Sequence, residues 1–263
     1  MKKLLQWLTL CLLAGLALQL FFVLRIASMA VLAPESTSFE RSQMWQIVQR
    51  KGQLPWRQQW VALSGISKNL QRAVLSSEDD AFASHNGIRW DAVESAWDKN
   101  TKAQARAERQ ASQRPGKPAP QAKVVGGSTI TQQLAKNLFL SGERNLLRKA
   151  QEAALTLMLE ACLPKRRILE IYLNSVEWGE GVFGAEAATQ HYFRKSASQL
   201  NAWEGARLAV MLPRPRYFEK LPQSPYLAER AEVIVARMNG VVLPRARSAF
   251  WASTRACKPP ALA

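Results

Sequence analysis

The segment from Gly126 to Glu152 combines side chains that could bind an anionic ligand beside a group that moves a proton. It begins with two glycines and a cluster of hydroxyl residues, continues with amides and cations, and ends on a single carboxylate. In chain order, the polar residues of interest are Ser128, Thr129, Gln132, Gln133, Lys136, Arg144, Arg148, Lys149 and Glu152. Such a series would suit an oxygen-rich anion. Two amphipathic helices with solvated charges would explain the same segment equally well.

A second carboxylate, Glu78, directly follows a predicted amphipathic helix at residues 64–77. The apolar positions of that helix are Ile66, Leu70, Ala73 and Val74, which recur with helical spacing. The loop after Glu78 closes with Asn86-Gly87, so the carboxylate could be fixed in a cleft. Alternatively, Glu78 and Asp79 form a solvated helix end, although acids near a helix C-terminus oppose the macrodipole. His85 is expected to orient this loop by hydrogen bonding rather than to act as a base.

Two predicted helices carry the cationic segment. Ser128 or Thr129 is expected to cap the first helix, whose free N–H groups would then face any ligand in front of it. The second helix places Glu152 off its apolar stripe, on the face shared with Arg148 and Lys149. This arrangement is either a surface ion pair worth a few tenths of a kcal/mol or a carboxylate held by cations that also bind an anionic leaving group.

The N-terminal residues predict a membrane anchor. Residues 4–24 carry no charge, and at ~1.5 Å rise per residue they span roughly 30 Å, the thickness of one bilayer core. Lys2 and Lys3 precede the segment and Arg25 follows it, which favours a cytoplasmic N-terminus and a body on the other side. A signal peptide is the alternative, because residues 27–30 include small side chains. Its apolar region would normally be only about 7–15 residues, so an uncleaved anchor is the preferred interpretation.

Composition limits the remaining choices. A chain of 263 residues with 48% hydrophobic content can bury one good core, with a small additional lobe. The net charge of +16 predicts an anionic partner, whether nucleic acid, a membrane face or a phosphorylated substrate. Three cysteines are too few for a disulfide framework, although Cys162 and Cys257 could pair in an oxidising compartment. Two histidines without a CxxC or HExxH pattern argue against a zinc site, and a GxxxxGK[ST] phosphate loop is absent.

Residues 99–123 differ in composition from their surroundings. They contain seven Lys or Arg, one acid, three prolines and no large apolar residue, so they cannot bury a face, and a mobile, exposed insertion is predicted after a helix at 90–98. The insertion would either improve solubility or contact anionic lipid headgroups, where each cation contributes about 1 kcal/mol. Elsewhere alternating strand patterns are scarce, so the domain is predicted to be mainly α. Aromatic residues at 39, 45, 56 and 60 would favour either the bilayer interface or packing against the domain.

Several longer motifs resemble those of the peptidoglycan glycosyltransferases, in the same order. The motifs are EDDAFASHNG, GGSTITQQLAKN, RKAQE, ILEIYLN with WGEGVFGAEAA, HYFRKSASQL and LAVMLPRP. They cover about residues 60–220, and several long motifs in order argue strongly against a chance match. The single anchor and the lack of a further domain make the chain similar to the monofunctional biosynthetic transglycosylases. The departure from the pattern is the insertion at 99–123, which is longer than expected between the first two motifs.

The resemblance implies a lysozyme-like, mainly α glycosyltransferase domain with a small membrane-facing lobe, preceded by one transmembrane helix. The segments are then 1–32 as cytoplasmic N-terminus and anchor, 33–60 as juxtamembrane connector, 61–240 as glycosyltransferase domain including the 99–123 insertion, and 241–263 as basic tail. It also implies polymerisation of lipid II on the periplasmic or outer face of the cytoplasmic (inner) membrane. The 4-hydroxyl of lipid II would attack a lipid-linked glycan donor with inversion, form a β-1,4 bond and release undecaprenyl diphosphate.

Residue roles follow from the same resemblance. Glu78 corresponds to the general base on the acceptor hydroxyl, and Glu152 to the glutamate that supports the donor side near the departing diphosphate. The cations matched to diphosphate binding are Lys136 and Arg144, with Arg148 and Lys149 close by. Polar residues matched to the donor site are Ser128 and Gln133. Residues assigned to the architecture of the motifs are Asp79, His85 and Asn174.

The implied partners are lipid II, the growing lipid-linked glycan, membrane lipids and other cell-wall synthesis or division proteins, with no nucleic acid. No cofactor is required, and a divalent cation (Mg or Mn) that assists some relatives would be compatible. A bifunctional penicillin-binding protein is disfavoured because no SxxK sequence is present. A lysozyme-like lytic enzyme would need neither the cation cluster nor the anchor. A non-enzymatic, membrane-tethered binder of anionic polymer would explain the charge but not the placed glutamates.

Overall fold

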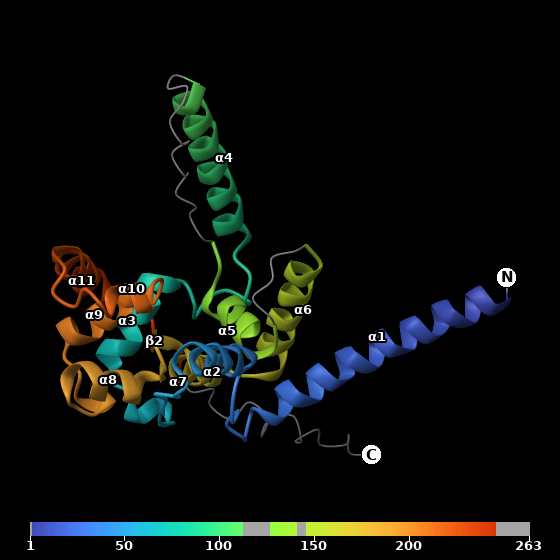
Figure 1. The fold of residues 1–263 in the computed structure, drawn as a ribbon, viewed down its shortest axis with the longest axis horizontal. Helices are drawn as coiled ribbons and strands as arrows, with labels where there is room; N and C mark the ends of the chain where they lie inside the picture. Colours follow the sequence, from blue (N-terminus) through green and yellow to red (C-terminus); the bar gives the residue numbers. More distant parts are fainter. Residues whose placement is uncertain (1, 113–126, 141–145, 246–263) are drawn as a thin grey trace, which may run out of the picture.

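The computed structural model describes residues 2–112, 127–140 and 146–245. The described part is mostly helical, as predicted, with three very short strands. Figure 1 shows a compact body from which two helices project, α1 and α4. Arg144 and Cys257 lie outside the described residues, so the predicted diphosphate contact of the first and the disulfide pairing of the second lie outside them as well.

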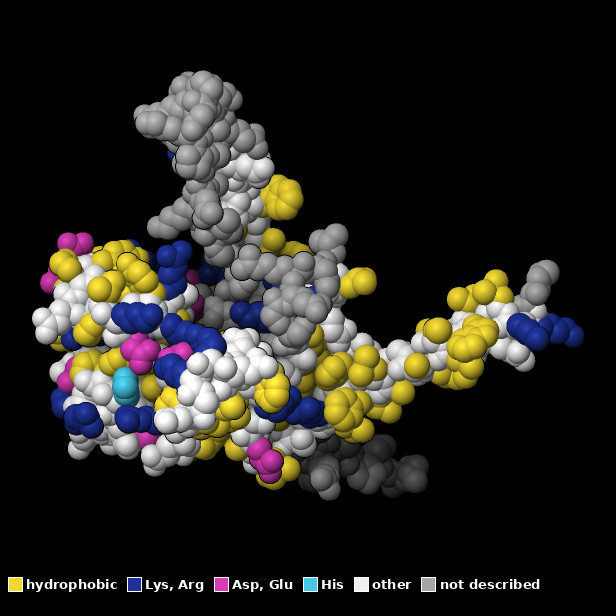
Figure 2. Space-filling view, viewed as in Figure 1, with side chains coloured by type: hydrophobic (Ala, Val, Ile, Leu, Met, Phe, Trp, Pro, Cys, Tyr) yellow, Lys and Arg dark blue, Asp and Glu magenta, His cyan; other side chains and the backbone are white. Residues whose placement is uncertain are grey.

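The N-terminal helix α1 (Lys2–Ser28) is long and apolar enough to cross a membrane. Most of it projects from the body, and hydrophobic side chains cover this projecting part (Figure 2). Its last turns are packed into the domain, where Ile26 is fully buried. Arg167 then fixes the chain directly after the helix, because its guanidinium donates to the carbonyl oxygens of Met29 (2.7 Å) and Leu32 (2.8 Å).

The body contains a helical core built on α3 (Lys68–Glu78), α9 (Ala202–Met211) and α11 (Pro225–Met238), which pack against one another. Helix α9 begins with a capping box formed by Asn201 and Glu204. Helices α3 and α9 approach closely at Gly205, where an added Cβ would lie 3.0 Å from the backbone nitrogen of Leu70. This core fixes α3, and therefore the position of Glu78 at its end.

A second group of helices surrounds α5 (Ile130–Phe139). Helix α5 packs against α6 (Leu146–Cys162), α7 (Lys165–Ser175) and α2 (Ser38–Lys51), and α6 also contacts α1. Within the predicted connector at 33–60, α2 is therefore a packed helix of the body. It begins with a capping box at Thr37 and Glu40.

A small sheet lies beside these helices, in the order β1 (Arg57–Gln58), β3 (Val182–Phe183) and β2 (Glu177–Gly179). The hairpin between β2 and β3 turns at Gly181, whose φ is +75° and whose Cβ position is occupied by the carbonyl oxygen of Pro55, so only glycine fits. Trp56 stacks on Phe183 with ring centroids 4.4 Å apart. Of the four aromatic residues considered for the bilayer interface, Trp56 therefore packs in the domain, whereas Trp45 is exposed.

Shorter elements complete the body. They are η1 (Leu63–Gly65), η2 (Ala197–Gln199), α8 (Ala185–Phe193) and α10 (Pro215–Phe218).

Helix α4 (Trp90–Ser112) is longer than predicted and extends away from the body (Figure 1). The predicted end of this helix at residue 98 was wrong, because residues 99–112 of the basic insertion continue it. Alanine, lysine, glutamine and arginine are among the strongest helix formers, and no proline lies between Trp90 and Ser112. The helix therefore forms from local propensity without burying an apolar face, and Trp90 and Trp97 on it are exposed.

Candidate active site

Glu78, the last residue of α3, is partly buried and receives a hydrogen bond from the side chain of Gln133 (Nε2 to Oε2, 2.9 Å). Burial raises the pKa of the Glu78 carboxyl above its ordinary value, and the nearby charge of Asp79 adds to this effect. The hydrogen bond from Gln133 acts in the opposite direction and favours the carboxylate. A raised pKa makes this carboxylate a stronger base toward a hydroxyl proton.

Asp79 connects the Glu78 loop to the start of α5. It is buried, and its carboxylate accepts hydrogen bonds from the His85 ring (Nε2, 2.8 Å) and from the backbone N–H of Ile130 (3.0 Å). The other ring nitrogen of His85, Nδ1, accepts from the backbone N–H of Gly87 (3.0 Å), so Nε2 is the nitrogen that donates to Asp79. The predicted orienting role of His85 agrees with these contacts.

The start of α5 is capped as predicted, and the capping residue is Thr129. Its hydroxyl accepts from the backbone N–H of Gln132, whose side chain bonds back to the backbone N–H of Thr129. The Thr129 hydroxyl also donates to the carbonyl oxygen of Gly87. The loop that follows Glu78 is thus fixed to α5 at both Asp79 and Gly87.

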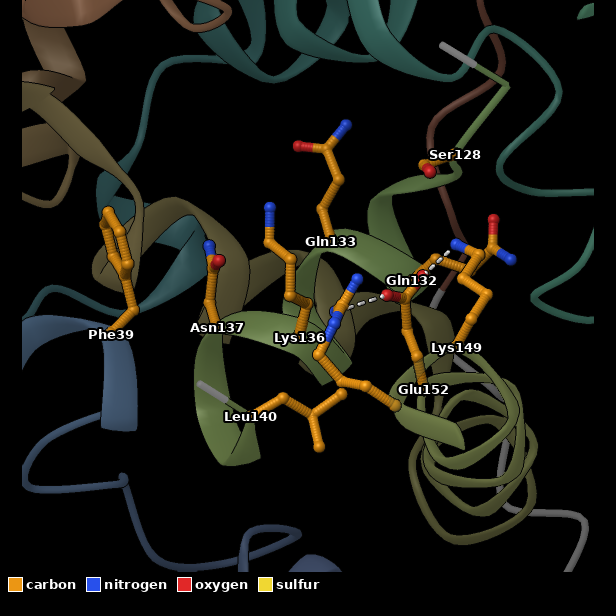
Figure 3. A pocket seen from close by; sticks show the side chains of 10 residues that line it. Phe39, Ser128, Gln132, Gln133, Lys136, Asn137, Leu140, Lys149 and Glu152 are labelled. Carbon is orange, nitrogen blue, oxygen red and sulfur yellow. Dashed lines mark hydrogen bonds and ion pairs between the residues drawn. The ribbon is translucent and has the colours of Figure 1, made fainter. Parts of the chain in front are cut away.

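A cavity of about 340 Å³ lies against α5 and α6. The residues that line it are Phe39, Ser128, Gln132, Gln133, Lys136, Asn137, Leu140, Arg148, Lys149 and Glu152. Figure 3 shows the side chains of Gln133, Lys136 and Asn137 projecting from α5 to the same side, as their helical spacing requires. Gln133 lines this cavity and also donates a hydrogen bond to Glu78, so it connects Glu78 to the cavity that Glu152 lines.

Glu152 is buried, with only 3% of its surface exposed. One carboxylate oxygen accepts from Arg148 (3.1 Å) and the other from Lys149 (Figure 3). The interpretation of this group as an ordinary surface ion pair is therefore wrong, because the carboxylate of Glu152 is buried. The cations reach the same cavity as their partner.

Of the described residues that line the cavity, Glu152 is the only carboxylate, and both of its oxygens are engaged by cations. Among the described residues, no group of three or more His, Cys, Asp or Glu side chains could hold a metal ion. The donor set does not fit a resident divalent cation.

Asn174 lies on α7, away from the cavity lining, and is fully buried. Its amide both accepts from the backbone N–H of Val61 and donates to the Val61 carbonyl oxygen, each at 2.9 Å. It therefore fixes the chain before α3 to α7, which agrees with the architectural role expected for it.

Sequence reasoning assigned no role to several residues at the site. Tyr172 is 1% exposed, and its hydroxyl donates to the side-chain oxygen of Gln133 (3.0 Å). Phe39 reaches the cavity from α2, which the sequence placed in a connector. Asn137 and Leu140 also line the cavity. Helical spacing from Gln133 and Lys136 could have identified Asn137, whereas Tyr172 and Phe39 depend on tertiary packing.

Comparison with known proteins gives a consistent result. Residues 46–239 match the family model described as Transglycosylase. A biosynthetic peptidoglycan transglycosylase of Burkholderia thailandensis is 51% identical over 231 residues, which cover 88% of this chain and 84% of that protein. Proteins with the same description from Herminiimonas arsenicoxydans (49% over 245 residues) and Janthinobacterium sp. (48% over 246 residues) are each matched over 93% of this chain and 99% of their own length.

Proposed function

The chain belongs to the peptidoglycan transglycosylase family, and we propose that it polymerises lipid II into glycan chains at the outer face of the cytoplasmic membrane. The observation that supports this proposal best is the hydrogen bond that joins Glu78 to the cation-lined cavity. Glu78 is joined through Gln133 to a cavity that contains Lys136, Arg148 and Lys149. A base beside a cation-lined cavity is what the transfer of a sugar from a diphosphate requires.

On the donor side, a lipid-linked glycan binds with its diphosphate against Lys136, Arg148 and Lys149. Negative charge develops on the leaving diphosphate as the bond from its oxygen to the anomeric carbon breaks. Cations that are already in place stabilise that charge without reorganisation. Glu152 holds Arg148 and Lys149 in position through its two ion pairs. Ser128 and Gln132 contribute polar contacts from the start of α5.

On the acceptor side, Glu78 takes the proton from the 4-hydroxyl of lipid II. The hydroxyl oxygen attacks the anomeric carbon from the face opposite the diphosphate and forms the β-1,4 bond. Undecaprenyl diphosphate leaves with the electron pair of the broken bond, so configuration at the anomeric carbon inverts. Proton transfer to a positioned carboxylate typically contributes about 10²–10⁴ in rate.

Helix α1 supports the proposed membrane placement of this reaction. Its apolar residues would cross the bilayer, with Lys2 and Lys3 on the cytoplasmic side and the catalytic domain on the periplasmic side. The burial of Ile26 and Met29 in the domain supports an anchor that remains attached. Helix α4 would approach the same surface, since Trp90 and Trp97 are exposed and aromatic side chains favour the bilayer interface.

The test of the polymerase is purified protein in detergent with lipid II. We expect wild-type protein to form glycan chains and Glu78→Gln to lose chain formation while still binding lipid II. The matched control is Glu229→Gln, a carboxylate on α11 distant from the cavity lining, which should polymerise like wild type. Chain growth by Glu78→Gln at the wild-type rate would overturn the assignment of the base, and no growth by wild type would overturn the proposed reaction.

The contribution of α4 can be measured separately. Removal of residues 103–120 deletes much of the basic insertion and leaves Trp90 and Trp97 in place. We expect weaker binding to vesicles that contain anionic lipid, and little change with neutral vesicles, because each cation near an anionic surface contributes about 1 kcal/mol. Unchanged binding to anionic vesicles would contradict this role.

A further inference from the structure

We propose that Tyr172 is a positioning residue for the base, acting through Gln133 to direct an N–H donor at Glu78. This inference rests on the proposed function, in which Glu78 accepts a proton. It concerns a buried hydroxyl on α7 that does not line the cavity.

The three side chains come from three different helices. The Tyr172 hydroxyl on α7 lies 3.0 Å from the Gln133 side-chain oxygen, and the Gln133 nitrogen lies 2.9 Å from Glu78 at the end of α3. Gln133 lies on α5, which packs against α7. The series Tyr172, Gln133, Glu78 therefore has one direction, with each donor pointing toward the carboxylate.

The direction depends on the tyrosine. A side-chain amide has a donor end and an acceptor end of similar shape, so its orientation is set by its partners. Tyr172 is fully buried, and burial together with the charges of Glu78 and Asp79 raises the pKa of its hydroxyl well above the ordinary value. The hydroxyl thus keeps its proton and acts as a donor, which binds the amide oxygen and leaves the amide nitrogen for Glu78.

Loss of the hydroxyl should change the titration of Glu78. Without it, the amide can turn its oxygen toward Glu78, which repels the carboxylate and favours the protonated acid. The other groups that act on Glu78 would remain. Asp79 is its neighbour in sequence and is held by His85 and the backbone N–H of Ile130. If phenylalanine replaced Tyr172, its ring would still fill the same space on α7. The effect would therefore be specific to the amide.

A purely structural role for Tyr172 makes a different prediction. The ring belongs to the main hydrophobic core. A role in packing alone would therefore be lost only when the ring itself is removed. Tyr172→Phe keeps the ring and removes only the hydroxyl. The matched control is Tyr192→Phe. The Tyr192 hydroxyl is partly buried and donates to the backbone carbonyl oxygen of Trp178 (2.8 Å). Tyr192 does not line the cavity.

The experiment measures glycan formation against pH and the Glu78 titration directly. The second measurement uses carboxyl ¹³C NMR of protein labelled at glutamate, in which the Glu78 signal is identified by its absence from Glu78→Gln. For Tyr172→Phe, we expect the acid limb of the rate and the Glu78 titration to move to higher pH together. At a pH below the acid limb of both wild type and Tyr172→Phe, each pH unit by which the limb moves lowers the rate of the variant about tenfold. Tyr192→Phe should leave both measurements unchanged.

A second variant tests whether Tyr172 acts through the amide of Gln133. Gln133→Leu removes the donor outright and should move the Glu78 titration in the same direction by at least as much. The double variant Tyr172→Phe/Gln133→Leu should titrate like Gln133→Leu, because the tyrosine acts only through the amide. An unchanged Glu78 titration in folded Tyr172→Phe, or additive shifts in the double variant, would overturn the proposal. The NMR arm decides this even if lipid II is not the substrate.

Discussion

The two predicted glutamates have the same side chain and opposite surroundings. Glu78 receives one hydrogen bond from a neutral amide, and the charge of Asp79 raises its pKa further. Glu152 is more deeply buried, and its two oxygens bind Arg148 and Lys149. A carboxylate that must accept a proton gains from a raised pKa, whereas a carboxylate that must hold cations gains from being paired. The difference in surroundings, and not the residue type, distinguishes their chemistry.

The largest expected effects come from neutralising each glutamate separately, which tests whether the two carboxylates have different roles. Glu78→Gln should lower the turnover rate by about 10²–10⁴ with little change in lipid II affinity, because only proton transfer is lost. Glu152→Gln should act mainly on the KM for the donor, because Arg148 and Lys149 lose the partner that positions them. Steady-state kinetics with lipid II separates the two effects.

The stability of the two variants provides the control for those kinetics. Glu152→Gln should destabilise the fold by less than the ~3–5 kcal/mol expected for a broken, fully buried ion pair, because the Lys149 side chain is 52% exposed and can be solvated. Chemical denaturation measures this loss. Equal kinetic patterns for the two folded variants would show that the glutamates do not have separate roles.

A smaller expected effect comes from the cation on α5. Lys136→Ala removes one charge from the cavity and should lower the turnover rate by about 10²–10³, the typical cost of losing one group that stabilises transition-state charge. Lys195→Ala is the matched control, since Lys195 pairs with Glu204 at 2.6 Å and does not line the cavity. A Lys136→Ala enzyme with wild-type turnover would place the diphosphate elsewhere.

The smallest expected effect is on the stability of the fold, and it tests the raised pKa of Glu78. Its pKa is raised in the folded protein, so the folded state binds the proton more tightly than the unfolded state. The resulting stabilisation is fully present below the unfolded pKa and is lost as pH rises through the folded pKa. At neutral pH, Glu78→Gln should therefore melt at a higher temperature than wild type.

Thermal unfolding across pH checks that prediction. Each kcal/mol added to the free energy of unfolding raises the melting temperature by about 2–4 °C in a domain of this size. The difference in melting temperature between Glu78→Gln and wild type should shrink toward pH 4. A constant difference at every pH would mean that the carboxyl does not titrate differently in the folded state.

Local patterns in the sequence predicted much of the fold. The cap at the start of α5 and the mainly α composition were correctly predicted, because both depend on neighbouring residues. The placement of Glu78 at the end of a packed helix was correct for the same reason. Local patterns failed at residues 99–112, where high helix propensity outweighed the lack of a buried face.

The site was less predictable, because its contacts join distant segments. The link from Glu78 to Gln133 spans 55 positions and the link from Tyr172 to Gln133 spans 39. The motifs supplied both glutamates and the cations, but not the direction of the hydrogen bonds between α3, α5 and α7. Nor could helical periodicity decide that Glu152 is buried, since that depends on the helices packed against α6.

The attachment of α1 to the domain has a mechanical consequence. Because Arg167 binds the carbonyl oxygens of Met29 and Leu32 and the end of α1 is packed into the body, the helix and the domain should tilt as one piece. A transmembrane helix changes its tilt when the hydrocarbon thickness around it changes. The angle at which the mouth of the cavity meets the headgroups would then follow the thickness of the bilayer. Under the proposed function, lipid chain length would thus change how a lipid-linked donor approaches the cavity.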